Sequence, residues 1–144
     1  MDKIVRDWNV SPSVLKFEIT EGALAEEGRA LKQIHKLRGQ GFSFAVDDFG
    51  TGYSSLNRIK ILPVDILKID RSFVMELAEK KVDRDLVEAI VTLAHDMGLK
   101  VVAEGVEDVE QKLILDDLGC DIYQGNLFGE PLCEGDFLKV LKEL

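Results

Sequence analysis

The stretch Phe42-Ser43-Phe44-Ala45-Val46-Asp47-Asp48-Phe49-Gly50 decides the fold class of this 144-residue chain. A largely apolar run of strand length ends here in two adjacent carboxylates and opens into a glycine-containing loop, which is typical of a buried strand in an α/β protein. Two carboxylates about 4 Å apart repel each other by roughly 4 kcal/mol in a surface-like dielectric, and solvent, a shared proton or cations relieve that repulsion. The stretch therefore favours a divalent-metal site at a strand end, with a plain turn and helix-capping aspartates as the alternative.

Short apolar runs alternate with helical patterns along the rest of the chain. Several runs are rich in β-branched or aromatic residues, as buried strands are, and the segments between them carry apolar residues at helical spacing. Such alternation predicts parallel strands joined by right-handed crossovers, in one α/β domain without a linker. We expect strands at 15–17, 42–46, 66–69, 101–103 and 121–123, and helices near 30–37, 83–97, 108–118 and 137–144.

Capping residues mark the ends of two of the expected helices. Asp83 is the expected N-cap of one helix, and Gly98 lies just beyond its end. Asp108 and Gln111 have the spacing of a capping box, which predicts the start of the next helix.

Each expected strand is followed by acidic or amide residues. Parallel strands place their carboxyl ends at one edge of the sheet, and (β/α) barrels and open α/β sheets carry their chemistry there. One acidic residue in this position can be a helix cap, whereas five successive strand ends of this kind indicate a functional rim. The rim residues are Glu18 and Glu21, Asp47 and Asp48, Asp70, Glu104 and Glu107, and Gln124.

Lys68 interrupts the apolar sequence of the strand expected at 66–69. Strand alternation puts its side chain on the face of Ile66 and Asp70, opposite Leu67 and Ile69. A buried ammonium group needs partners, because desolvation of a lone charge is costly. We expect the carboxylates of neighbouring strands to be these partners; the alternative is a lysine on a solvated face of the sheet.

The overall composition argues against several classes of protein. The formal net charge of −9 disfavours electrostatic binding to nucleic-acid polymers or to anionic membranes. The chain contains no apolar run near the ~20 residues of a membrane span and no secretory signal at its start, so we expect a cytoplasmic protein without membrane contact. Cys120 and Cys133 lack metal-ligand spacing, and reduced thiols are expected.

Five ordered motifs resemble the EAL domain, a bacterial family of cyclic-di-GMP-specific phosphodiesterases. The resemblance runs over nearly the whole chain and implies a TIM-like (β/α) barrel. It also implies hydrolysis of one phosphodiester bond of cyclic-di-GMP to give linear pGpG, with two Mg²⁺ or Mn²⁺ ions. The matching segments are Phe17–Glu21, Asp47–Leu56, Leu67–Val74, Val102–Glu107, and Gln124–Gly125 with Phe128–Gly129 and Pro131–Leu132.

The resemblance implies catalytic and metal-binding roles for five rim residues. Glu18 resembles a ligand of one ion, Asp47 a carboxylate shared by both ions, and Asp48 a ligand of the second. Lys68 resembles the cation that holds the attacking water and balances the negative charge of the site. Glu104 resembles the proposed general base, or a ligand that acts through water.

The other rim residues resemble groups around this centre. Glu21 resembles a residue that braces the loop after Asp48, and that loop feeds the dimer contact in relatives. Glu107 and Gln124 resemble substrate-side and water-positioning groups. We place Asp70 with these substrate-binding or loop-bracing residues.

The chain also departs from the family pattern. A full (β/α) barrel takes about 250 residues, so we expect residues 1–144 to be the C-terminal portion of an EAL domain. The expected fold is a partial TIM-like barrel of about five parallel strands with flanking helices. The strand bearing the Glu-Ala-Leu motif has no counterpart, since Glu21-Gly22-Ala23-Leu24 overlaps the Phe17–Glu21 motif. The strand that supplies a metal-binding asparagine is also missing.

Two expectations follow from the shortened pattern. Five strands cannot close an eight-stranded barrel, and open edges that face water invite association, so we expect a homo-oligomer with cyclic-di-GMP as its small-molecule partner. One metal would lose ligands, so we expect weak hydrolysis or none. The alternative is a degenerate, non-catalytic module that binds nucleotide or a protein partner. A third interpretation, an aldolase- or enolase-like barrel piece with Lys68 beside a metal, is supported by no other motif.

Overall fold

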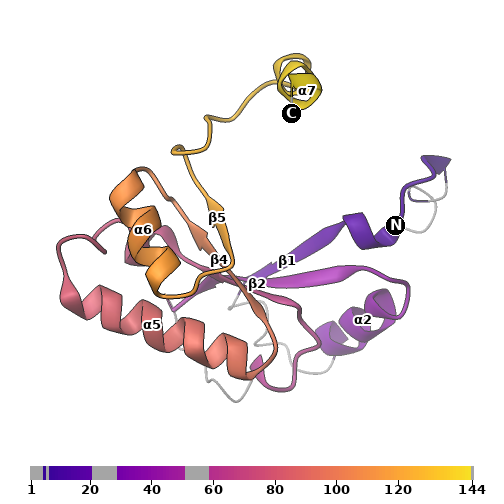
Figure 1. Ribbon diagram of the computed structural model, residues 1–144. Coiled ribbons are helices and arrows are strands. Elements are labelled where there is room, and N and C mark those ends of the chain that lie inside the picture. Colours follow the sequence, from indigo (N-terminus) through magenta and orange to yellow (C-terminus); the bar gives the residue numbers. More distant parts are fainter. Residues whose placement is uncertain (1–4, 6, 21–28, 51–58, 144) are drawn as a thin grey trace.

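Five strands alternate with helices in the computed structural model (Figure 1), which describes residues 5, 7–20, 29–50 and 59–143. A short 3₁₀ helix η1 (Pro12–Val14) precedes the first strand. The strands are β1 (Lys16–Thr20), β2 (Ser43–Phe49), β3 (Ile66–Ile69), β4 (Lys100–Glu104) and β5 (Ile122–Gln124). The helices are α2 (Arg29–Arg38), α4 (Arg71–Val74), α5 (Lys81–Asp96), α6 (Val109–Asp117) and α7 (Glu134–Glu143).

Within the described residues, the strands form one parallel sheet in chain order, β1-β2-β3-β4-β5. This arrangement confirms the predicted α/β class, with about five parallel strands and flanking helices. Strands β1, β2 and β4 extend beyond the predicted apolar runs and include acidic residues. The reason is that backbone pairing continues past the apolar side chains, with Thr20 opposite Asp47 and Glu104 opposite Gln124.

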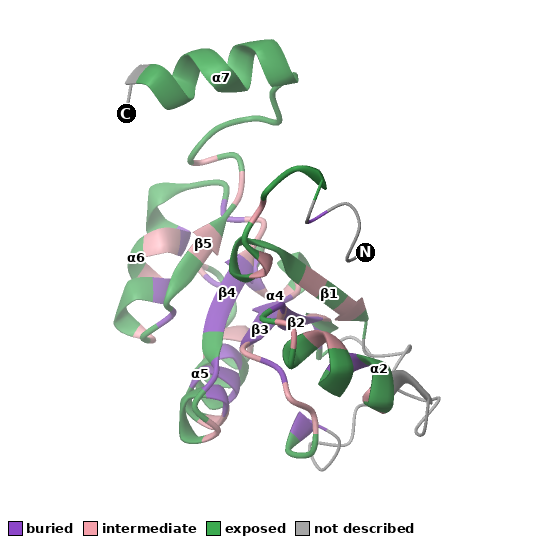
Figure 2. Cartoon of the chain, turned by 90° about the vertical axis from the view of Figure 1, so that its right-hand side faces the viewer, coloured by how far each residue is buried: buried purple, intermediate pink, exposed green. Residues whose placement is uncertain are grey.

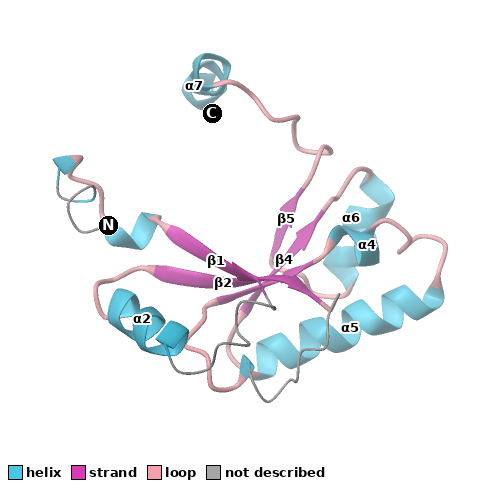
Figure 3. Cartoon of the chain, turned by 180° about the vertical axis from the view of Figure 1, so that it is seen from behind, coloured by secondary structure: helices cyan, strands magenta, loops and turns pink. Residues whose placement is uncertain are grey.

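The two faces of the sheet bury different side chains. Leu67 and Ile69 have no exposed surface and belong to the main core, which the helices cover. Figure 3 shows α2 and α5 on the same side of the sheet, and Figure 2 shows the buried residues concentrated in the middle strands and along α5. A separate, smaller apolar cluster consists of Ala45, Ile66 and Val102. Alternation along β3 places Lys68 on the face of this smaller cluster.

The helix ends agree with the capping signals except at one position. Asp108 and Gln111 form the predicted capping box at the start of α6. Gly98 has a φ of +72° just beyond α5, as a residue at that position should. The prediction that Asp83 caps α5 is wrong. Lys80 is the N-cap, because its carbonyl already accepts hydrogen bonds from the N–H groups of Asp83 and Arg84. Asp83 lies in the first turn, where its negative charge interacts favourably with the positive end of the helix dipole.

Helix α7 lies apart from the rest of the protein at the end of an extended segment (Figure 1). Its described side chains are exposed along its whole length (Figure 2). Among the described residues, no helix combines the length and the apolarity that a membrane span would need.

Candidate functional site

A buried lysine on β3 contacts carboxylates from three other strands, on the face of the sheet that carries Ala45, Ile66 and Val102. The Lys68 side chain on β3 is only 7% exposed, and its Nζ lies 2.8 Å from Oε1 of Glu18 on β1. The same atom lies 2.8 Å from Oδ1 of Asp47 on β2 and 2.7 Å from Oε1 of Glu104 on β4. An ammonium group carries three N–H donors, so the number of carboxylates matches the number of donors. We call these four residues the Lys68 cluster; they come from four different strands.

The positive charge of Lys68 is stabilised in this position. Burial by itself lowers the pKa of the ammonium group, but the contacts with Asp47, Glu104 and Glu18 outweigh burial and hold the pKa above its ordinary value. Lys68 is therefore fully charged at neutral pH. The cluster is an ion-pair network in which loss of Lys68 would leave two largely buried carboxylates without this compensation.

A bulge in β2 brings the neighbouring Asp47 and Asp48 to the same site. Successive side chains of a regular strand point to opposite faces, which would separate the two carboxylates. However, β2 advances three residues from Val46 to Phe49 where β3 advances two. Asp48 has a φ of +55°, in the left-handed region that non-glycine residues seldom occupy. Such bulges redirect side chains next to functional sites.

Asp47, Asp48 and Glu104 form a group that could hold a metal ion. Each offers a carboxylate oxygen, and these oxygens lie within 4.8 Å of one another. An all-carboxylate donor set suits hard cations such as Mg²⁺ and Mn²⁺. Glu18 is not part of this group and is connected to it through Lys68.

The surroundings of one ligand oxygen also fit a cation. Oδ1 of Asp47 is buried, and no described residue donates an aligned hydrogen bond to it, although the ammonium group of Lys68 lies 2.8 Å away. A buried carboxylate oxygen without a hydrogen bond is costly unless positive charge compensates it. Lys68 compensates this oxygen in the metal-free protein, and the all-carboxylate donor set fits a divalent cation.

Two glycines allow close packing around the loop between β4 and α6. Gly105 has a φ of +71°, and a Cβ there would lie 2.6 Å from Cβ of Arg71. A Cβ on Gly125 would overlap the backbone of Val106, whose N–H donates to the carbonyl oxygen of Gln124 at 3.1 Å. The sequence shows both glycines directly after a rim residue: Gly105 follows Glu104 of β4, and Gly125 follows Gln124 of β5.

The remaining predicted site residues lie outside the Lys68 cluster. Oδ1 of Asp70 accepts a hydrogen bond from the backbone N–H of Ser72 at 2.9 Å, so Asp70 is the N-cap of α4. A hydrogen bond from the Ser72 side chain, together with this backbone N–H, outweighs burial and holds the pKa of Asp70 below its ordinary value. Since β3 ends at Ile69, Asp70 lies just beyond the strand, and a face shared with Lys68 stays a prediction. The backbone N–H of Glu107 donates to Oε1 of Gln111, and the side chain of Glu107 is exposed. Glu21 lies outside the described residues.

The fold and the rim define the class of protein: a TIM-barrel-like α/β protein with carboxylates gathered where its parallel strands end. The chain belongs to the EAL domain family, whose family model matches residues 2–131. It is similar to two proteins of Pseudomonas aeruginosa. It is 44% identical over 119 residues to the cyclic di-GMP phosphodiesterase NbdA and 39% identical over 136 residues to the cyclic di-GMP phosphodiesterase RocR. These matches cover 82% and 94% of this chain, but 15% and 35% of the relatives.

Solved structures support the same family. The EAL domain of Mycobacterium smegmatis DcpA superimposes with a TM-score of 0.92 at 38% identity, over 98% of this chain and 64% of the DcpA chain. The manganese and cyclic-di-GMP complex of Klebsiella pneumoniae BlrP1 superimposes with a TM-score of 0.82 at 31% identity. That match covers 90% of this chain and 33% of BlrP1. The chain therefore spans about two thirds or less of each of these proteins.

Proposed function

We propose that the chain is part of a metal-dependent cyclic-di-GMP phosphodiesterase, which hydrolyses one phosphodiester bond of cyclic-di-GMP to give pGpG. The observation that carries the proposal is the convergence of Asp47, Asp48 and Glu104 within 4.8 Å beside Lys68, in a member of the EAL family. NbdA and RocR are named as such phosphodiesterases, and BlrP1 forms a complex with manganese and cyclic-di-GMP.

The carboxylates of the rim would hold the metal. Asp47, Asp48 and Glu104 would bind Mg²⁺ or Mn²⁺, with Glu18 as a further ligand from β1. Two bound cations would neutralise developing charge on the phosphodiester oxygens and lower the pKa of the attacking water.

Side chains of this protein would position water and substrate, accept the proton and brace the adjacent segments. Lys68 would orient the carboxylates and the attacking water through its ammonium group. The Glu104 carboxylate, whose Oε1 lies 2.7 Å from Nζ of Lys68, would accept a proton as general base. The amide of Gln124, opposite Glu104 in the β4–β5 ladder, would position water or substrate, and Glu107 would act on the substrate side. Asp70, and Glu21 outside the described residues, would brace adjacent segments.

Catalysis by this chain alone would be weak. Glu18 lies on the edge strand β1 of the described sheet, and its side chain is 53% exposed, so its position is not enforced from both sides. The same observation favours the second candidate function, a module that binds nucleotide or a protein partner without turnover. We place the protein in the cytoplasm, in keeping with its two free thiols.

Product analysis separates these functions. Cyclic-di-GMP would be incubated with the protein and Mn²⁺, and pGpG measured by reversed-phase chromatography. We expect slow Mn²⁺-dependent formation of pGpG, abolished in Asp47→Asn and unchanged in Asp85→Asn, which alters an exposed carboxylate on α5. Nucleotide binding by calorimetry without pGpG would favour the non-catalytic module. Failure to bind either Mn²⁺ or cyclic-di-GMP would contradict the proposal.

A further inference from the structure

The Lys68 cluster has more contacts than a structural ion pair requires. One ammonium group contacts carboxylates from β1, β2 and β4, at 2.7–2.8 Å in each case. The Glu18, Asp47 and Glu104 side chains are 53%, 21% and 18% exposed, so two of the three carboxylates are largely removed from water. Without a cation between them, these carboxylates would repel one another across the sheet.

Lys68 shares its partners with the candidate metal group. Asp47 and Glu104 contact Lys68 and are also two of the three residues whose oxygens gather within 4.8 Å. Among the described residues, Asp48 and Glu18 bring the number of carboxylates near the Lys68 ammonium group to four. A divalent cation bound by Asp47 and Glu104 would lie close to the ammonium group and repel it.

We propose that Lys68 is the internal counter-ion of the metal-free site. Its ammonium group holds the carboxylates of three strands in their binding arrangement, and a divalent cation partly displaces it from Asp47 and Glu104 on binding. Lys68 therefore lowers the affinity for metal while it stabilises the protein in the absence of metal. This inference rests on the metal-binding part of the proposed function and does not depend on hydrolysis.

Replacement of Lys68 by methionine tests both the effect of the lysine on metal affinity and its effect on the stability of the metal-free protein. Lys68→Met keeps a long unbranched side chain and removes the charge. The matched control is Lys81→Met, since Lys81 forms an exposed ion pair with Asp85, and its side chain is 84% exposed. Thermal unfolding would be followed in EDTA and in saturating Mn²⁺, and the Kd for Mn²⁺ would be measured by calorimetry.

The two variants should respond differently. We expect Lys68→Met to have a lower Tm than the wild type in EDTA and a larger rise in Tm on addition of Mn²⁺. Its Kd for Mn²⁺ should fall by about tenfold or more, since a nearby unit charge shifts proton-binding equilibria by one to three powers of ten. Lys81→Met should match the wild type. An unchanged Tm in EDTA, or an equal or weaker Mn²⁺ affinity in Lys68→Met, would overturn the inference and leave the metal site standing. Absence of Mn²⁺ binding in both proteins would overturn the metal site as well.

A second measurement uses the wild-type protein, in case Lys68→Met does not fold. Lysine labelled with ¹³C at Cε would be observed by NMR during titration with diamagnetic Mg²⁺, with the Lys68 signal assigned from Lys68→Arg. We expect the Lys68 signal to shift and to saturate with the Kd that calorimetry gives for Mg²⁺, while the signal of Lys81 stays in place. A Lys68 signal that does not move when calorimetry shows the site filled would refute the displacement.

Discussion

The left-handed backbone of Asp48 is the residue-scale feature that makes the site compact. A non-glycine residue in this region costs of order 1–3 kcal/mol and persists where its surroundings enforce it. Here β2 pairs with β3 on both sides of the bulge, at Val46 and at Phe49, so the ladder holds Asp48 in place. Strand pairing on both sides offsets the cost of this conformation, which places two adjacent carboxylates at one site.

Gly125 is predicted to be irreplaceable even by alanine. A Cβ there would overlap the backbone of Val106, which cannot move away because its N–H and C=O bond to Gln124 and Leu127. We expect Gly125→Ala to lower the free energy of unfolding by about 3 kcal/mol, at the upper end of overpacking effects. Urea denaturation would measure the change. Gly135→Ala is the control, because nothing lies within 4 Å of its Cβ position, and it should change stability by less than about 1 kcal/mol.

The two cysteines are predicted to differ in reactivity. Cys120 is buried, and burial raises the pKa of its thiol to about 11, whereas Cys133 is exposed. At pH 8 the thiolate fraction of Cys120 is therefore about a hundredfold below that of an ordinary cysteine. We expect Ellman's reagent to modify one thiol rapidly and the second only after unfolding. A rapid reaction of Cys133→Ser would contradict this assignment.

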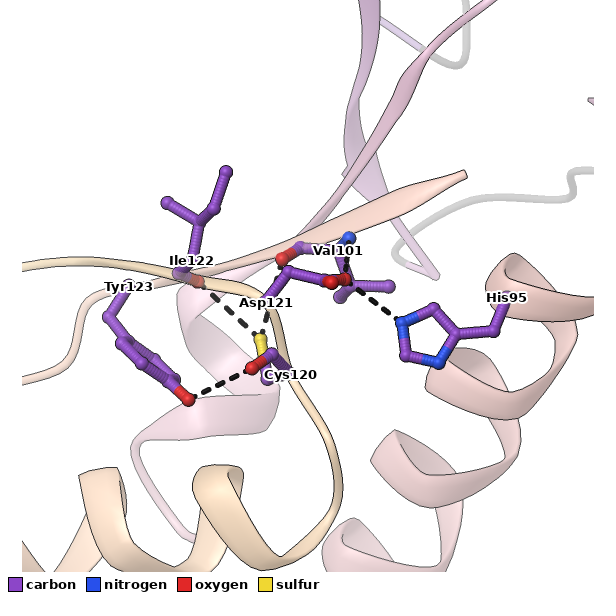
Figure 4. Close-up of polar contacts among 6 residues, drawn as sticks. All are labelled: His95, Val101, Cys120, Asp121, Ile122 and Tyr123. Atoms are coloured by element: carbon purple, nitrogen blue, oxygen red, sulfur yellow. Dashed lines mark hydrogen bonds and ion pairs between the residues drawn. The ribbon is translucent and has the colours of Figure 1, made fainter. Parts of the chain in front are cut away.

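At the scale of elements, one carboxylate connects α5, β4 and β5 at the edge of the sheet opposite the rim (Figure 4). Oδ2 of Asp121 accepts a hydrogen bond from the backbone N–H of Val101 at 2.8 Å and lies 2.9 Å from Nε2 of His95. Burial raises the pKa of Asp121, but the contacts with His95 and Val101 outweigh this effect, and the pKa lies below its ordinary value of 3.8. The ionised form is therefore favoured by folding.

Asp121→Asn should destabilise the protein in a pH-dependent way. A carboxyl group with a depressed pKa contributes stability above its unfolded pKa and loses that contribution as the pH falls through the folded pKa. We expect a loss of about 1 kcal/mol at pH 7, since both partners are partly exposed to water. The difference from the wild type should shrink between pH 5 and pH 3, as measured by urea denaturation across that range. A difference that stays constant or widens towards pH 3 would contradict the assignment, and Asp85→Asn should show little change at any pH.

At the scale of the whole molecule, the described surfaces invite association. The apolar residues of α7 are about half exposed, and β1 and β5 are edges of the described sheet. Exposed apolar helices and unpaired strand edges favour contacts with another chain. The apolar residues of α7 are Phe137, Leu138, Val140 and Leu141.

Self-association of the chain stays a prediction and is tested by multi-angle light scattering. We expect the mass to rise with concentration in the micromolar range, and the double substitution Phe137→Asp and Leu141→Asp to shift the protein towards the monomer. The two side chains are four positions apart, so they lie on the same face of α7. Thermal unfolding of the double variant should stay close to that of wild type, since α7 lies apart from the sheet (Figure 1). A monomer at every concentration would disprove the prediction.

The sequence alone predicts the number, chain order and parallel direction of the described strands, and which residues follow them. It could do so because hydrophobic periodicity, capping residues and glycines are local signals. The capping box of Asp108 and Gln111 was predictable on this basis. The family was predicted from the resemblance of five ordered motifs, and carboxylate partners for Lys68 were predicted on the neighbouring strands. Glu18 was not covered by that expectation, because β1 is not a neighbour of β3.

The geometry of the site, in contrast, depends on strand pairing and packing. The bulge at Asp47 and Asp48 depends on how β2 pairs with β3, and the N-cap role of Asp70 depends on where β3 ends. The contact of Gly125 with Val106 joins segments that no local pattern connects. Pairing and packing involve residues distant in sequence. Their free energies select one of several conformations whose energies differ little when only local propensities are considered.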